Sequence, residues 1–526
     1  MKQNNLINLL SKLVQISAAV SLAAMLFFST QYGLGLSPDS IAYIKGAEGL
    51  LTGKGTEYMS VQWPPLYPLM LALFGYVGNH DLLLGARVLN ALLIGLNFWL
   101  ITQLLIKYIS INRWAAYLLA FVISLHEVLV YVGFYAWSEP LVITTILINF
   151  FIIEKYVNQE NKNNALLECS LILFAILSIY TRYIGVNVAV LNAVIVLFFI
   201  GRVNIYTRVW RTLAQVVVPA VAIYPWLAWH RAIDDNNATQ RGLQWHPIST
   251  EKIIEGFINI GKWLFPSSSK FDGLIPPMVL LITGMIVVFL VISTVVYASF
   301  KLVNIFKEKN LKKDTRNKRI ILLGILGLFI IFYLAFLTFT ISFVDRKLLL
   351  DNRFLAPIFI PIFLLLLGLV SLISKPIVRY ACFGLFVVVM TFSYINLRSW
   401  LLINYFDGVE INSRGNINKP IYNNIRKFSK HCQIYSDKPW NISLYFEKKV
   451  RWLPTEILFG TGLINQTYKS EIESLKENTN LVVVENKDDP IINEIDLLAN
   501  LERIYDGKDG LIWKNKNIDF SMCESN

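Results

Sequence analysis

The stretch from Ser37 to Pro68, SPDSIAYIKGAEGLLTGKGTEYMSVQWPPLYP, is the first long polar segment of the chain and follows an apolar run near residues 13–30. It holds a carboxylate, Asp39, directly after Ser37-Pro38. Ser favours the N-cap of a helix, Pro fits its first position, and an acid is stabilised in the first turn. The sequence therefore predicts a helix that begins here, with Asp39 and Tyr43 on one face.

The composition on either side of this stretch is typical of a membrane protein. Of 526 residues, 55% are hydrophobic and 16% are charged, whereas soluble proteins carry about 25% charged residues. Many windows of about 18 residues have no charge, which indicates transmembrane helices rather than the alternating strands of a β-barrel. The formal net charge of +12 comes from basic residues in short loops, which favours membrane topology over nucleic-acid binding.

The apolar runs predict an all-α polytopic membrane protein with about eleven transmembrane helices. Residues 66–78 are too few to span, so we expect a re-entrant or interfacial helix there. The first run favours an uncleaved helix over a signal peptide, because further spans follow. The predicted spans are about 13–30, 82–106, 114–133, 139–157, 164–181, 184–200, 212–229, 276–299, 320–342, 354–373 and 378–396.

The basic clusters predict the orientation of these spans. The strongest cluster lies between residues 301 and 319 and marks a cytoplasmic loop. The N-terminus is then cytoplasmic, and both the catalytic-loop candidate, residues 31–81, and a long loop, 230–275, lie outside. An odd number of spans places the C-terminus outside as well. We therefore expect a multi-pass protein of the cell (inner) membrane.

After residue 396 the composition becomes polar, and short β-type runs alternate with helical ones. We expect strands at 433–436, 450–453, 481–485 and 510–513, and helices at 418–430 and 468–477. The division is therefore a membrane domain, 1–396, and a small extracytoplasmic α/β domain, 397–526. Cys432 and Cys523 lie in the second domain and could form a disulfide outside the cytosol.

The polar stretch and three later segments resemble the GT-C glycosyltransferases, polytopic enzymes that use polyprenyl-phosphate sugars. The likeness is to the branch with protein O-mannosyltransferases and lipid A aminoarabinose transferases, whose bacterial members are often described as RgtA/B/C/D-like. In the stretch, the matching residues are Asp39, Tyr43, Ala47, Leu51, Gly53, Gly55, Pro64, Pro65, Tyr67 and Pro68. The later segments are Trp137-Ser138-Glu139-Pro140, Thr181-Arg182-Tyr183-Ile184-Gly185 and Asn352-Arg353-Phe354-Leu355-Ala356-Pro357.

This resemblance implies a GT-C fold and a role for Asp39 as catalytic base or acceptor-orienting residue. Many members carry a second acid beside that Asp, where this chain has Ser40, which departs from a metal-binding acidic pair. Glu139 follows Ser138 at a helix start, and it is either a simple helix-start acid or a partner that orients the acceptor or assists Asp39. Tyr43 and Tyr67 are the candidate substrate-binding residues of the stretch.

A departing lipid phosphate requires cations at the membrane face, and Arg suits phosphate because its guanidinium donates two parallel hydrogen bonds. Four basic residues are predicted on the outer face: Arg182, Arg346, Lys347 and Arg353. Each of them could instead be an anchor that reaches the membrane interface. In the long outer loop, residues that could shape a sugar pocket are His230, Arg231, Asp234, Asp235, Arg241, Trp245 and His246.

No cofactor is predicted with certainty. The five histidines show no HxxxH or HExxH spacing and the four cysteines no CxxC, so a divalent metal is possible but unsupported by ligand spacing. The hypothesis is an inverting, extracytoplasmic glycosyltransferase of the cell envelope. Its partners are a polyprenyl-phosphate sugar donor, a lipid, glycan or protein acceptor, and membrane lipids. The alternatives are a transporter or lipid flippase, which would favour mid-membrane charges and repeats, and a non-catalytic assembly protein.

Overall fold

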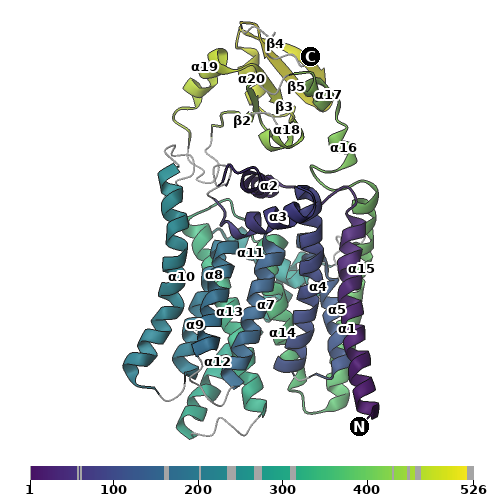
Figure 1. Cartoon of the computed structure of the whole chain (residues 1–526), viewed down its shortest axis with the longest axis vertical. Coiled ribbons are helices and arrows are strands. Elements are labelled where there is room, and N and C mark those ends of the chain that lie inside the picture. Colours follow the sequence, from purple (N-terminus) through teal and green to yellow (C-terminus); the bar gives the residue numbers. More distant parts are fainter. Residues whose placement is uncertain are drawn as a thin grey trace.

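The computed structural model shows a tall helical bundle with a small α/β domain at one end, opposite the N-terminus (Figure 1). It describes residues 2–55, 59, 62–109, 111–158, 165–200, 203–233, 245–265, 275–308, 315–428, 432–446, 450–456 and 464–517. The long helices of the bundle are α1 Lys2–Ser29, α4 Leu82–Tyr108, α7 Glu139–Asn158, α10 Ile205–Ile233, α12 Pro277–Glu308, α13 Thr315–Phe343, α14 Asn352–Ser371 and α15 Pro376–Phe406. Shorter ones are α5 Arg113–Ser124, α6 Glu127–Gly133, α8 Ala165–Thr181 and α9 Val186–Phe199.

The prediction of a mostly helical protein with several membrane-spanning helices is confirmed. Among the described residues, seven helices are long and apolar enough to cross a membrane, and the bent pair α5–α6 would add an eighth. Shorter apolar helices occupy residues 165–181, 183–199 and 376–391. The chain is a multi-pass membrane protein, whereas the total of about eleven spans and the orientation of the termini stay predictions.

One predicted span, 114–133, is not a straight helix. It is divided into α5 and α6, which meet at 59°. His126 caps α6, because its Nδ1 accepts the N–H of Val128 at 3.2 Å, and its buried ring packs against Phe359 at 4.5 Å. After α6, residues 134–138 lead to the start of α7 at Glu139.

The polar stretch forms two short helices, α2 Pro38–Leu51 and α3 Leu66–Val77, which lie across the upper end of the bundle (Figure 1). Ser37 caps α2, with its Oγ accepting the N–H of Ser40, and Ser40 Oγ accepts the N–H of Ser37 in return. The long loop at 230–275 contains a further helix, α11 Thr250–Lys262, which packs on α12. The short helix expected at 66–78 is therefore present as α3, with 12 residues.

The C-terminal domain is a five-stranded mixed sheet in the order β2-β1-β3-β5-β4. Its strands are β1 Ile434–Ser436, β2 Val450–Trp452, β3 Leu481–Val484, β4 Leu501–Gly507 and β5 Gly510–Asn515. Its helices are α16 Arg414–Ile417, α17 Pro420–Arg426, α18 Pro439–Phe446, α19 Tyr468–Asn478 and α20 Ile491–Asp496. The pair β2–β1 and the pair β1–β3 are parallel, and β5 is antiparallel to its neighbours.

Sequence reasoning missed β4, α16, α18 and α20. β4 is an edge strand with the charged sequence LERIYDG, and edge strands often carry charges that discourage pairing with other chains. The division at residue 396 stays a prediction, and α15 crosses it to end at Phe406. Cys432 is disulfide-bonded, whereas its expected partner Cys523 lies outside the described residues.

The domain directly contacts the end of the bundle that lies opposite the N-terminus. Helix α18 packs on α2, and its Trp440 and Leu444 contact the apolar core of the membrane part. The polar stretch is therefore enclosed between the helix ends below it and the α/β domain above it (Figure 1).

Candidate functional site

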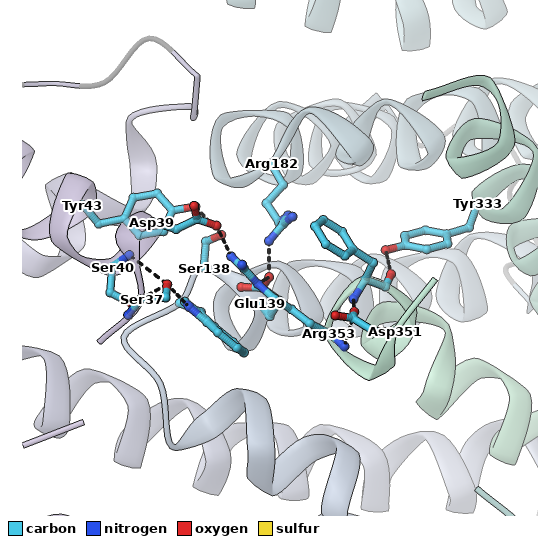
Figure 2. Close-up of polar contacts among 12 residues, drawn as sticks. Ser37, Asp39, Ser40, Tyr43, Ser138, Glu139, Arg182, Tyr333, Asp351 and Arg353 are labelled. Atoms are coloured by element: carbon cyan, nitrogen blue, oxygen red, sulfur yellow. Dashed lines mark hydrogen bonds and ion pairs between the residues drawn. The ribbon is translucent and has the colours of Figure 1, made fainter. Parts of the chain in front are cut away.

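Four charged side chains meet at the helix ends that face the C-terminal domain, the ends predicted to lie outside (Figure 2). Arg353 donates through Nη2 to Asp39 Oδ2 at 2.5 Å and through Nε to Glu139 Oε1 at 2.6 Å. Arg182 forms a second ion pair with the same oxygen of Glu139. The Arg353 guanidinium thus contacts both Asp39 and Glu139, and the Arg182 guanidinium contacts Glu139. We name Asp39, Glu139, Arg182 and Arg353 the outer cluster.

Every member of the outer cluster lies at a helix terminus, which explains why residues 314 positions apart can meet. Asp39 is in the first turn of α2, and Glu139 begins α7. Arg182 lies in extended backbone just after α8, and Arg353 is the second residue of α14. The partial positive charge of the α2 and α7 N-termini stabilises both carboxylates.

A cation is disfavoured at a helix N-terminus, so Arg353 needs nearby negative charge. Asp351 supplies part of it as the N-cap of α14: its Oδ1 accepts the backbone N–H groups of Arg353 and Phe354, each at 3.0 Å. Burial raises the pKa of Asp351 above its ordinary value, and the N–H of Phe354 and the charge of Arg353 oppose that shift. Asp351 and the two acids of the outer cluster together hold Arg353 in place.

The two acids differ in exposure, and this difference separates their possible roles. The Glu139 side chain is 1% exposed, whereas that of Asp39 is 22% exposed. Glu139 Oε1 is shared by two guanidinium groups, and its Oε2 is buried with no hydrogen-bond partner among the described residues. Of the two, Asp39 is therefore the carboxylate that an incoming substrate can reach.

Aromatic rings contact the guanidinium groups of both arginines. The Arg353 guanidinium lies 4.1 Å from the centre of the Trp137 ring, a cation–π contact. Trp137 Nε1 donates to Ser37 Oγ at 2.7 Å, so one ring contacts both the α2 cap and Arg353. The Phe354 ring is 5.5 Å from each guanidinium, and Tyr333 donates to the Phe354 carbonyl at 2.6 Å.

A narrow crevice with aromatic walls adjoins the outer cluster. Tyr43 links the two, because its Oη is 3.1 Å from Ser138 Oγ, the residue before Glu139. Burial raises the pKa of the Tyr43 phenol above its ordinary value, so it stays protonated at physiological pH. The lining residues are Ala42, Tyr43, Met59, Trp63, Pro65, Pro68 and Trp226. Tyr67 packs behind this wall, with its ring centre 5.0 Å from that of Tyr43.

Other predicted residues do not join the outer cluster. Arg346 and Lys347 are exposed in the turn after α13. The ring of Trp245 packs on Phe343 at 5.0 Å, and the His246 N–H donates to Ser342 O at 2.6 Å. That end of α13 is ten residues beyond Tyr333, about 15 Å along the helix. Side chains of His230 and Arg231, and residues Asp234, Asp235 and Arg241, lie outside the described part of the chain.

Several residues of the site were missed from the sequence. Trp137 and Ser138 stood in a quoted motif but received no role, and Trp63 preceded the Pro-Pro pair. Asp351, Tyr333 and Trp226 carried no local signal, because their importance comes only from helices that meet in space. Within the described residues no group of three or more His, Cys, Asp or Glu side chains could hold a metal ion.

Comparison with known proteins supports the fold. No protein-family model matches the chain, and no curated protein matches it by sequence. ArnT from Cupriavidus metallidurans bound to undecaprenyl phosphate superposes with a TM-score of 0.51 at 13% identity, over 97% of this chain and 98% of that one. The same protein in the apo state gives 0.53 at 12% identity, over 94% and 96%. The chain therefore has the same overall fold as ArnT along nearly its whole length.

Proposed function

We propose that the protein transfers a sugar from a polyprenyl-phosphate donor to an acceptor hydroxyl at the outer face of the membrane. The observation that carries the proposal is the outer cluster, in which a partly exposed carboxylate, Asp39, adjoins two guanidinium groups at the helix ends. Such a pairing suits a reaction that needs a base to deprotonate the acceptor hydroxyl and cations to stabilise the departing phosphate. The undecaprenyl phosphate bound to the similarly folded ArnT is consistent with a polyprenyl-phosphate partner here.

The proposed reaction is a single displacement. Asp39 Oδ1 accepts the proton of the acceptor hydroxyl while its Oδ2 stays with Arg353. The acceptor oxygen bonds to the anomeric carbon as the bond from that carbon to the phosphate oxygen breaks, and the electron pair leaves with the phosphate. Attack from the opposite side inverts the anomeric centre.

Arg353 and Arg182 would stabilise the departing phosphate. A guanidinium has five N–H donors, and the contacts to Asp39 and Glu139 use only some of them. The remaining donors can bind phosphate without loss of the carboxylate contacts. Glu139 is too buried to meet the acceptor, so we assign it the orientation of the two arginines rather than proton transfer.

We assign the donor sugar to the aromatic crevice, which is too narrow in this structure to admit a water molecule and would have to open for a sugar ring. Carbohydrate rings present C–H faces that pack against aromatic side chains, and Tyr43, Trp63 and Trp226 all line this crevice. It begins at Tyr43, one hydrogen bond from the residue before Glu139. A sugar held here would lie beside the outer cluster.

The test is turnover by the purified protein in lipid nanodiscs. A labelled polyprenyl-phosphate sugar is incubated with membrane-extracted lipid, glycan and protein acceptors, and the label is followed into product. Label transfer together with release of polyprenyl phosphate is expected. Movement of the labelled lipid across proteoliposome membranes without bond cleavage would contradict the proposal and support a flippase instead.

A further inference from the structure

A segment that leads into the C-terminal domain lies directly against the chain that enters α2. After α15, residues 408–413 run beside residues 33–36, and Leu36 pairs with Glu410 in a parallel bridge. Asn412 is buried, and its Nδ2 donates to Leu34 O at 2.7 Å across a sequence separation of 378 residues. The entry to α2, and therefore Asp39, is held by a distant part of the chain.

The same entry is held on its other side by the residues before α7. Gly35 pairs with Tyr135, through Gly35 N–H to Phe134 O at 2.8 Å and Ala136 N–H to Gly35 O at 3.0 Å. A side chain at Gly35 would collide with the Tyr135 ring, since an added Cβ would lie 2.9 Å from it. Three chain segments thus lie side by side, with the α2 entry in the middle.

One hydrogen bond crosses between the two outer segments. Tyr135 Oη donates to Glu410 Oε1 at 3.3 Å. The Tyr135 ring stacks on Trp137, with centres 4.1 Å apart and planes 15° apart. Trp137 in turn donates to Ser37 Oγ, and its ring makes a cation–π contact with the Arg353 guanidinium. A continuous set of contacts therefore runs from Glu410 to both the α2 cap and Arg353.

The backbone at Glu410 has an uncommon conformation. Its φ of 53° lies in the left-handed region, where residues other than glycine are uncommon and strained. Gly408, two residues earlier, has φ of 72° and is the residue type expected there. A glutamate in such a position is held by its surroundings, here the bridge to Leu36 and the bond from Tyr135.

The protonation of Tyr135 is compatible with this bond. Burial raises the pKa of the phenol above its ordinary value, and the nearby Tyr131 and the charge of Glu410 raise it further. The facing groups are Tyr131, Trp137 and Glu410. Tyr135 thus remains a hydrogen-bond donor across the physiological range.

We propose that Tyr135 and Glu410 are positioning residues through which the C-terminal segment 408–413 aligns Asp39 with Arg353. This inference rests on the proposed function, because alignment matters only if both groups act on one substrate. The stacked pair Tyr135–Trp137 transmits the position of the segment to the α2 cap and to the guanidinium. The C-terminal domain would then take part in the reaction without contact with the reacting atoms.

The experiment compares Glu410→Ala, which removes the acceptor of the Tyr135 hydroxyl, with Tyr135→Phe and the double variant in full-length protein in nanodiscs. Each single change should lower kcat about fivefold, the value expected for loss of one hydrogen bond, with the donor KM unchanged. The double variant should be no slower than either single variant, because both remove the same contact. Glu410→Gly should lose as much kcat even though it relieves the backbone, and Glu502→Gln on β4 should match wild type.

Amide hydrogen exchange gives a readout that does not depend on turnover. In Glu410→Ala and Tyr135→Phe, residues 37–41 should exchange faster than in wild type, while α19 should be unchanged. Wild-type kcat and wild-type exchange in both variants would overturn the inference. If the wild-type protein transfers no sugar, the proposed function fails, and the exchange data still decide whether the coupling exists.

Discussion

An acid–arginine ion pair lies at each end of the helices α7 and α8, and the arginine at one of these ends, Arg211, belongs to α10. The outer pair is Glu139 with Arg182, described above. At the opposite end, Glu168 in the first turn of α8 lies 3.4 Å from Arg211, and Tyr156 donates to the same oxygen at 3.0 Å. Gln215 donates to the Glu168 carbonyl at 3.5 Å. We name Glu168, Tyr156, Arg211 and Gln215 the inner cluster.

The two clusters contain similar side chains, but they differ in whether an acid is exposed enough for a substrate to reach it. The inner cluster has one acid, 8% exposed, which is shared between a phenol and an arginine. The outer cluster has a second, more exposed acid, an arginine bound to both acids, and an aromatic crevice. A buried ion pair alone is thus weak evidence for function. An accessible acid beside unused guanidinium donors is a stronger indication.

The largest expected effect comes from Asp39→Asn. The amide keeps the size and can still contact Arg353 but accepts no proton, and general-base catalysis contributes about 10²- to 10⁴-fold. We expect kcat to fall about a thousandfold in the nanodisc assay. The unfolding midpoint and polyprenyl-phosphate binding serve as controls and should stay near wild type. Full turnover in Asp39→Asn would remove the base from the proposed mechanism.

Arg353→Lys should follow in size. Lysine keeps the charge but lacks the planar fork that reaches Asp39 and Glu139 together, so the acids lose their common partner. We expect kcat to fall about a hundredfold, because loss of one preorganised donor to developing charge costs about that much. Arg346→Lys is the matched comparison, since that side chain is exposed in a turn. Equal losses at both positions would show that the outer cluster has no special role.

The sequence predicted much of the outer cluster, and its helix-terminal positions explain why. Asp39, Glu139, Arg182 and Arg353 each stand where an apolar run meets polar residues, so topology alone places them at one membrane face. Trp226 and Tyr333 could not be found in this way. Both lie inside apolar runs, where an aromatic residue is indistinguishable from one that faces lipid.

Trp63→Ala tests the crevice and should have a smaller effect. Loss of one aromatic wall weakens the contact with the sugar by about 1 kcal/mol, which corresponds to about fivefold in binding. We expect the KM for the donor to rise about fivefold while kcat changes little. Trp114→Ala, an exposed tryptophan on α5, is the control. A fall in kcat with unchanged KM would show that the donor sugar does not bind in this crevice.

The smallest effect on turnover is expected at the inner cluster. Glu168→Gln keeps an acceptor for Tyr156 and Arg211, so it should leave kcat unchanged and cost about 1 kcal/mol of stability. Glu139→Gln leaves two guanidinium groups without their shared charge and should cost about 3 kcal/mol. Thermal unfolding in detergent and the transfer assay measure both. If Glu168→Gln lowered kcat as much as Glu139→Gln, the contrast between the clusters would be lost.

By itself, the sequence determined the membrane class, the starts of α2 and α7 and the residue types that stand there, whereas α1, α10 and α13 begin five or more residues before their predicted spans. Apolar length and capping chemistry are local properties, and they survive whatever the helices pack against. Only the tertiary structure decided which ends meet, that one arginine serves two acids, and that residues 408–413 lie against the entry to α2. Those relations depend on the packing of segments hundreds of residues apart, which no local pattern encodes.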